Sequence, residues 1–399
     1  MLTRKLATRA VHAGQHAGDT SDWRPTSVPV YHSVAYWYAK MAELDAVFES
    51  KASGYVYGRH GNPTVEALEA ALASLEGAER ALVYTSGMAA VHAALLGAGA
   101  SSTRGVVCAS DVYGATRGLL DGILAPTGVN RVYVNVQDHD GVREALTVGS
   151  PAALVCEAIS NPLLRVADIA ALADLTHRAG AALIVDSTFA TPCLVRPLEL
   201  GADYAVASAT KYLGGHGDAL AGVVACGEDR GRDLEAARRL MGPSLAPQEA
   251  WKVRRGLVTL ALRMREHCAN AQRVADWLDA QRGVAAVHYP GLLTHPEHPL
   301  AARQFEGHGF GGVVAFELAN ADRADAFRFL DALELIRPAP SLGDAMSLAL
   351  HPASSSHRTV APEERHRLGI TEGLIRVSVG IEDAEDIIED LAQALTAVS

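Results

Sequence analysis

The chain has 399 residues, 49% of them hydrophobic, and a formal net charge of -11. This length exceeds what one compact core usually holds, so we expect two domains. The negative charge and the lack of a basic tract exclude nucleic acid and anionic membranes as partners, because Lys and Arg must first neutralise such surfaces. We therefore expect a small-molecule partner.

The five cysteines are scattered and never spaced as CxxC, which favours reduced thiols over a disulfide framework or a zinc site. The N-terminal stretch has no apolar core and no cleavage site, so we expect no signal peptide and a cytoplasmic protein. The most apolar long window, residues 81–100, is interrupted by Ser, His and Gly and is not expected to span a membrane.

Residues 1–60 contain many Pro, Tyr and His residues with little periodicity, and we interpret them as an extended N-terminal arm. From about residue 61 to residue 255, short β-rich runs alternate with helical patterns. The predicted strands are uniformly apolar and cover residues 81–84, 105–110, 131–136, 152–156, 181–185, 204–208 and 222–226. Helices between such strands indicate an α/β fold with a mostly parallel sheet flanked by helices.

After Gly256 the pattern changes. A long helix over residues 265–281 precedes two well-separated strands, 312–318 and 374–380, and a closing helix. We interpret residues 256–399 as a smaller C-terminal α/β domain, with residues 61–255 as the larger one.

Polar residues follow several of the predicted strands, at the edge where open parallel sheets bind ligands. They are Asp111, Glu157, Asp186 and Lys211. Each taken alone has an ordinary explanation as a helix cap or a surface charge, but the four together indicate a ligand site.

A lysine among small residues and hydroxyls, opposite an acid, suits an aldehyde cofactor such as pyridoxal 5'-phosphate (PLP). Desolvation favours the free, nucleophilic amine of Lys211, and a buried carboxylate such as Asp186 keeps the cofactor's ring nitrogen protonated. The cofactor phosphate needs small donors, which a helix start can provide. The candidate donors are Ser86, Gly87, Met88, Ser208 and Thr210. The Ser86–Met88 stretch by itself is also typical of an ordinary strand-to-helix turn.

The ordered motifs "YVYGRHGNPT", "TSGMAA", "DVYGATRG", "DSTFATP", "SATKYLGGHGDALAG" and "LIRVSVGIEDAED" resemble those of the cystathionine and methionine γ-lyase and γ-synthase family of PLP enzymes. The resemblance covers nearly the whole chain. It implies fold type I of the PLP-dependent transferases. It also implies that Lys211 holds the cofactor covalently and shuttles protons, and that Asp186 contacts the ring nitrogen.

The same resemblance implies further roles. Tyr113 would stack on the cofactor ring and pass a proton to the departing sulfur. Arg376 would grip the substrate α-carboxylate, with Asn161 and Ser341 as helpers. Tyr57 and Arg59 would reach the phosphate of a neighbouring subunit, which implies a homotetramer of active dimers.

The implied reaction is γ-elimination of a sulfur amino acid, cystathionine or methionine, to 2-oxobutanoate, ammonia and a thiol. Four positions depart from the methionine γ-lyase pattern and leave the substrate open: Ala115, Arg238, Arg239 and Met346. The alternatives are γ-replacement on an activated homoserine and a catalytically silent PLP-binding protein. His295 and His298 stand beside prolines without an evident third ligand, so we expect no metal.

Overall fold

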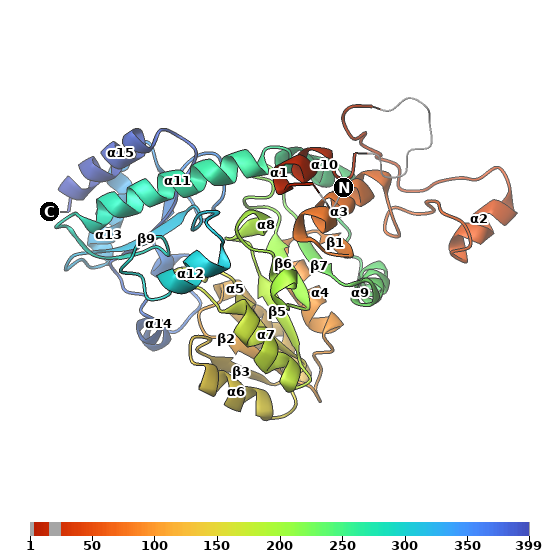
Figure 1. The fold of residues 1–399 in the computed structure, drawn as a ribbon, viewed down its shortest axis with the longest axis horizontal. Helices are drawn as coiled ribbons and strands as arrows, with labels where there is room; N and C mark the ends of the chain where they lie inside the picture. The colour runs from red at the N-terminus through yellow and green to blue at the C-terminus, as the bar shows by residue number, and fades with distance from the viewer. Residues whose placement is uncertain (1–3, 16–24, 399) are drawn as a thin grey trace.

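The long helix α11, Leu260–Asp279, connects two β-sheets in the computed structural model, which describes residues 4–15 and 25–398 (Figure 1). It packs on strands of the smaller sheet and also contacts helices that belong to the larger one. In the parts of the chain that are described, no helix is both long and apolar enough to cross a bilayer.

The larger sheet has seven strands in the order β1-β7-β6-β5-β4-β2-β3. All of its pairings are parallel except those of β7, which runs opposite to both its neighbours. The predicted mostly parallel α/β sheet is therefore confirmed. The strands lie within a residue or two of their predicted positions: β1 Arg80–Tyr84, β2 Val106–Ala109, β3 Arg131–Val134, β4 Ala153–Glu157, β5 Ala182–Asp186, β6 Tyr204–Ser208 and β7 Gly222–Cys226.

Helix α3 shows why these segments fold locally as they do. Asn62 caps it by accepting from two backbone N–H groups, and Gly77 ends it with a left-handed backbone at φ +68°. The α3 residues on its apolar stripe are fully buried. The helices and short helical turns of this region are α3 Pro63–Glu76, α4 Gly87–Gly97, α5 Gly114–Gly118, η1 Leu119–Leu124, η2 Ala125–Thr127, α6 His139–Thr147, α7 Ile169–Arg178, α8 Thr191–Leu194, η3 Pro197–Leu200, α9 Glu228–Met241 and α10 Pro247–Leu257.

The smaller sheet has five strands, of which the periodicity predicted two. Those two, β9 Val313–Leu318 and β12 Leu374–Ser378, pair antiparallel at its centre. The others are β8 Val284–His288, β10 Arg337–Pro338 and β11 Leu348–Leu350, which are short or only half-buried and so carry little pattern. The helices here are α12 His298–Gln304, α13 Arg323–Ala332, η4 Pro352–Ser354, α14 Pro362–Leu368 and α15 Ala384–Thr396.

The sequence predicted an extended N-terminal arm, but the structure shows that part of the arm is helical. It contains α1 Leu6–His12 and α2 Met41–Phe48, and α2 projects from the body (Figure 1). Buried Arg254 of α10 holds the end of α1 by donating to the carbonyl oxygens of Ala10, Val11 and Ala13 at 3.3, 3.0 and 2.8 Å. This helix end depends on a residue far along the chain, which is why local periodicity missed it.

We predict that Arg254→Met lowers the free energy of unfolding by about 2 to 4 kcal/mol, because three carbonyls lose their donor and two of them, on Ala10 and Ala13, belong to buried residues. Thermal denaturation measures the loss of stability, and limited trypsin digestion measures release of α1 through cleavage after Arg9, which is buried in the intact fold. The control is Arg255→Met at the neighbouring exposed position. Equal stability and equal digestion of the two variants would contradict the assignment.

Candidate functional site

Strand register brings several of the strand-end polar groups to one edge of the larger sheet. Glu157 and Asp186 are register partners at the carboxyl ends of β4 and β5, and β6 beside them ends at Ser208. The first residue of the reversed strand β7, Gly222, pairs with both Ser208 and Tyr84. A Cβ at Gly222 would lie 2.1 Å from the Ser86 carbonyl oxygen, so only glycine lets the two neighbouring strand ends approach this closely.

A cavity of about 580 Å³ opens at this edge. Its lining includes every site residue predicted from the sequence except Asp111, Tyr57 and Arg59: Ser86, Gly87, Met88, Tyr113, Glu157, Asn161, Asp186, Ser208, Thr210, Lys211, Ser341 and Arg376. Segments from both sheets contribute, since Ser341 and Arg376 come from the smaller sheet's part of the chain.

Lys211 carries the amine at the cavity wall. Its Nζ donates to the Ser341 hydroxyl at 3.0 Å, and its side chain is half-buried. Burial lowers the pKa of this amine, and the nearby positive charge of Arg376 lowers it further, against a smaller opposing effect of Asp344. A lysine held this way is more readily available as the uncharged nucleophile.

Asp186 supplies a carboxylate to the same cavity. Its Oδ1 accepts from the Thr188 backbone N–H at 2.9 Å and from the Thr188 hydroxyl at 2.5 Å. Removal from bulk water raises the pKa of this carboxyl, while the Thr188 hydrogen bonds lower it. The Thr188 oxygen in turn accepts from the Ser208 backbone N–H at 2.8 Å, which ties the ends of β5 and β6 together.

The start of helix α4 forms another part of the cavity wall. Ser86 caps the helix by accepting from the Ala89 N–H, and the N–H groups of the first turn have no partners within the helix. Gly87 lies so close to Ser208 that a Cβ would stand 2.8 Å from the Ser208 Cβ. The first-turn N–H groups, the helix dipole and the Ser208 hydroxyl together favour an anion here. Thr210 also lines the cavity, and its hydroxyl oxygen accepts from the Ala221 N–H at 3.0 Å.

Arg376 is a buried residue of the cavity wall. Its guanidinium donates to the Asn161 side-chain oxygen at 2.8 Å and to the Ser341 carbonyl oxygen at 2.9 Å. Its Nε has no hydrogen-bond partner among the described residues. Burial lowers the pKa of Arg376 to about 10, so the group remains a cation at neutral pH and a carboxylate ligand would offset its desolvation.

Tyr113 stands at the start of α5 with 42% of its surface exposed. Its backbone N–H donates to Glu157 Oε1 at 2.7 Å, and the Asn161 N–H donates to Oε2 of the same carboxylate at 3.0 Å. Burial and the negative charge of Asp186 raise the pKa of Glu157 well above its usual range. The buried Glu157 carboxyl therefore positions two of the predicted site residues.

Tyr57 and Arg59 lie outside this cavity. The Arg59 guanidinium lies over the Tyr57 ring, 5.6 Å from its centroid, and donates to the Arg239 carbonyl oxygen. Arg59 lines a separate polar hollow of about 270 Å³ beside α9. Within one protomer, neither residue lines the cavity of the Lys211 amine, and only Arg59 lines the separate hollow.

The four departures from the methionine γ-lyase pattern occupy distinct settings. Ala115 is half-buried in α5, directly after Gly114, and Met346 is 56% exposed. Arg238 is buried and donates to Glu69 and to the Val83 carbonyl, while Arg239 pairs with Glu235 at 2.7 Å. Both arginines are thus engaged with their own protomer's α3, β1 and α9.

Sequence reasoning missed some of the cavity residues. It overlooked Thr188, although a hydroxyl two residues after Asp186 is typical of a local carboxylate turn. It also overlooked the turn Ser354–Ser356 and Arg358, which line the cavity from a loop with no periodic pattern. His295 and His298 do not converge on a metal, since His298 binds the Pro290 carbonyl oxygen at 2.8 Å, and the described residues contain no group of three or more metal-ligating side chains.

The cavity matches the requirements of PLP. The start of α4 and the Ser208 hydroxyl suit a phosphate, Asp186 suits a protonated ring nitrogen, and the Lys211 amine suits an aldehyde. The Nε of buried Arg376, which has no hydrogen-bond partner among the described residues, could donate to a carboxylate ligand.

Comparison with known proteins agrees with this assignment. The chain is 42% identical to L-methionine gamma-lyase of Pseudomonas putida over 98% of this chain and 97% of that protein. It is 39% identical to O-succinylhomoserine sulfhydrylase of Pseudomonas aeruginosa over 98% of this chain and 95% of that protein. A crystal structure of a putative O-acetylhomoserine (thiol)-lyase from Campylobacter jejuni, which contains a pyridoxyl-lysine monophosphate, is 31% identical, with a TM-score of 0.92 over 98% of this chain and all of that chain.

The family model described as Cys/Met metabolism PLP-dependent enzyme matches residues 7–396. The fold is therefore that of fold type I PLP enzymes, and the cofactor is PLP. The chain belongs to the PLP-dependent enzymes of Cys/Met metabolism.

Proposed function

We propose that this enzyme is a carbon–sulfur lyase that catalyses γ-elimination of a sulfur amino acid. The substrate thioether and one water give a thiol, ammonia and 2-oxobutanoate. The observation that carries the proposal is the single cavity lined by Lys211, Asp186 and Arg376. The 42% identity to a methionine γ-lyase favours elimination.

Each residue of the cavity has a role that follows from its chemistry. Bound PLP supplies the electron sink that makes the substrate α-proton acidic. The Lys211 amine, whose pKa is lowered, removes and returns protons beside it. Arg376 orients the substrate through the α-carboxylate. Asp186 would keep the ring nitrogen of bound PLP protonated. The exposed Tyr113 hydroxyl delivers a proton to the departing sulfur.

The second candidate is γ-replacement, in which an incoming thiol bonds to the γ-carbon of an activated homoserine, the acyloxy group leaves as a carboxylate, and the amino group is retained. It is supported by the 39% identity to a sulfhydrylase that is named for O-succinylhomoserine. A catalytically silent PLP-binding protein is the least favoured, because mere cofactor storage needs neither the Arg376 carboxylate site nor an exposed Tyr113.

We also propose that the working enzyme is a homotetramer of active dimers, in which Tyr57 and Arg59 complete a neighbour's cavity. Supporting this, the arm that precedes them exposes apolar side chains. Trp37 is 88% exposed, Met41 76% and Phe48 60%, which is unfavourable unless another surface covers them.

We predict that borohydride reduction of the holoenzyme fixes the pyridoxyl group to Lys211. The other lysines, Lys5, Lys40, Lys51 and Lys252, lie outside the cavity lining. Peptide mass mapping identifies the modified lysine, with Lys252→Ala as the control that keeps the label. Attachment at any other lysine would overturn the site assignment.

We predict that Thr188→Val moves the acidic limb of the pH profile of kcat/KM to higher pH, by up to about one unit. The Thr188 hydroxyl lowers the pKa of Asp186, so its removal lets the carboxyl take up a proton at a higher pH. The matched control is Thr176→Val, whose buried hydroxyl bonds the Leu172 carbonyl oxygen at 2.6 Å in remote helix α7. A limb that stays in place or moves to lower pH contradicts this role of Thr188.

The reaction type is decided by incubating the holoenzyme with L-methionine, L,L-cystathionine, or O-succinyl-L-homoserine with a thiol. We expect 2-oxobutanoate from a thioether substrate to exceed new thioether formed from the activated homoserine. Chromatography of the thioethers and a dehydrogenase-coupled assay of the 2-oxo acid measure the two outcomes. Dominant thioether formation would establish γ-replacement, and no product from any mixture would favour the silent protein.

A further inference from the structure

A second arginine, Arg358, lines the active-site cavity in addition to Arg376. It follows the turn Ser354–Ser356 in the loop after η4. Arg358 and Ser354 also line an adjacent hollow of about 360 Å³, whose other lining residues are Arg323, Ala353 and Arg365. The two spaces therefore share a wall that carries a cation.

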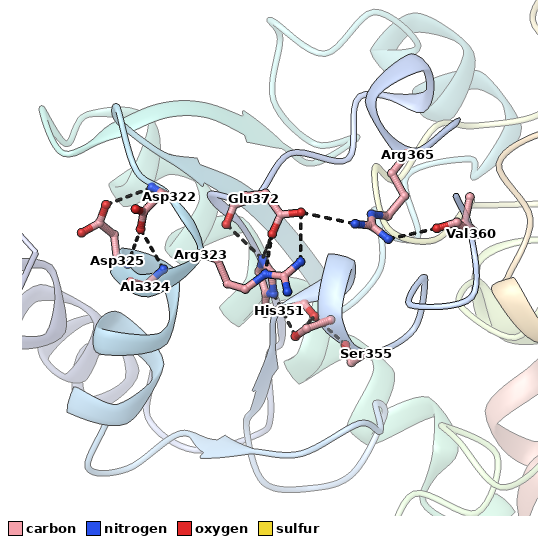
Figure 2. Close-up of polar contacts among 10 residues, drawn as sticks. Asp322, Arg323, Ala324, Asp325, His351, Ser355, Val360, Arg365 and Glu372 are labelled. Atoms are coloured by element: carbon pink, nitrogen blue, oxygen red, sulfur yellow. Dashed lines mark hydrogen bonds and ion pairs between the residues drawn. The ribbon is translucent and has the colours of Figure 1, made fainter. Parts of the chain in front are cut away.

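The other two arginines of the hollow share one carboxylate partner (Figure 2). Glu372 lies between them and accepts from Arg323 at 2.7 and 3.1 Å and from Arg365 at 3.3 Å. The Arg323 hydrogen bonds hold the pKa of the Glu372 carboxyl below its usual range, so it stays negative. Neither Arg323 nor Arg365 lines the active-site cavity.

Arg358 differs from these two. Its side chain is exposed, and within residues 4–15 and 25–398 it forms no hydrogen bond, ion pair or ring contact. No acidic residue lines the hollow, and the two acids of the cavity are engaged elsewhere. Glu157 accepts from the Tyr113 and Asn161 N–H groups, and Asp186 from Thr188. Arg358 is thus a positively charged side chain at the cavity that has no acidic side chain as a partner.

The loop that carries Arg358 is nevertheless well held. The His351 ring bonds the Ser354 hydroxyl at 2.9 Å and the Glu372 carbonyl oxygen at 3.0 Å (Figure 2). The Ser355 hydroxyl donates to the His351 carbonyl oxygen at 2.6 Å. The backbone N–H of Arg358 donates to the Ser355 carbonyl oxygen at 3.2 Å. Binding an anion at Arg358 would therefore order one side chain rather than a loop.

We propose that Arg358 binds a carboxylate at the distal end of the substrate, so that this site prefers substrates with a second carboxylate over methionine. The inference rests on the proposed function, in which Arg376 holds the α-carboxylate. Two cations lining one cavity suit an amino acid with a carboxylate at each end. Cystathionine and O-succinylhomoserine both have that chemistry, whereas methionine ends in a neutral methyl group.

The test uses two unreactive ligands that differ only in the distal group, L-2-aminopimelate with a carboxylate and L-2-aminoheptanoate with a methyl. Calorimetry on the holoenzyme is expected to show about tenfold tighter binding of L-2-aminopimelate. Arg358→Gln should abolish this preference by weakening L-2-aminopimelate alone, and Arg358→Lys should retain part of it. The matched control is Arg323→Gln, which removes a neighbouring cation that is paired with Glu372 and does not line the active-site cavity, and it should keep the preference.

Equal binding of the two ligands to the parent enzyme, or a preference that survives Arg358→Gln, overturns the inference and leaves the proposed function standing. Binding of neither ligand overturns the proposed function along with it. The kcat/KM values of Arg358→Gln for L,L-cystathionine and O-succinyl-L-homoserine then show which of these two substrates places its distal carboxylate on Arg358. A loss of about tenfold for either one, with methionine unchanged, supports the role of Arg358.

Discussion

The parallel pairing of β4, β5 and β6 is the constraint on which the site depends. It places Glu157 and Asp186 side by side at the sheet edge, with Ser208 at the end of the next strand. Burial raises the pKa of both carboxyls, the charge of Asp186 raises that of Glu157 further, and hydrogen-bond donors oppose these shifts. Backbone N–H groups from the following loops provide those donors, so the sheet edge and its loops form one hydrogen-bonded unit.

The reversed strand β7 completes that unit. Because it starts with a glycine between β1 and β6, the helix that follows β1 begins against the segment that carries Lys211. An anion site and an amine are thereby brought to one cavity from positions more than a hundred residues apart. The same arrangement explains why small residues recur here, since any Cβ at Gly87 or Gly222 would meet backbone or side-chain atoms under 3.0 Å away.

The cavity also depends on the contact between the two sheets. Arg376 belongs to β12 of the smaller sheet, yet its hydrogen bond to Asn161 reaches the loop after β4. Lys211 reaches in the opposite direction, to Ser341. These cross-connections place the substrate carboxylate site relative to the amine, and the exposed Arg358 adds a second positive charge from the smaller sheet's side. In the proposed role of Arg358, two cations lining one cavity discriminate a dicarboxylic substrate from a neutral one.

The sequence by itself determined the seven strands of the larger sheet, its mostly parallel character, the PLP chemistry and many of the polar residues of the cavity. It could do so because buried strands have a strong local pattern, and because Asp186 ends one such strand and Lys211 comes three residues after another. It did not predict helix α1, three strands of the smaller sheet, Thr188 as a partner of Asp186, or Arg358 at the cavity. Only the tertiary structure decided α1, the three strands and Arg358, because they depend on partners distant in sequence, such as Arg254 for α1, or on a loop whose position no periodicity encodes. Thr188 differs, since it lies two residues after Asp186 and is a local signal.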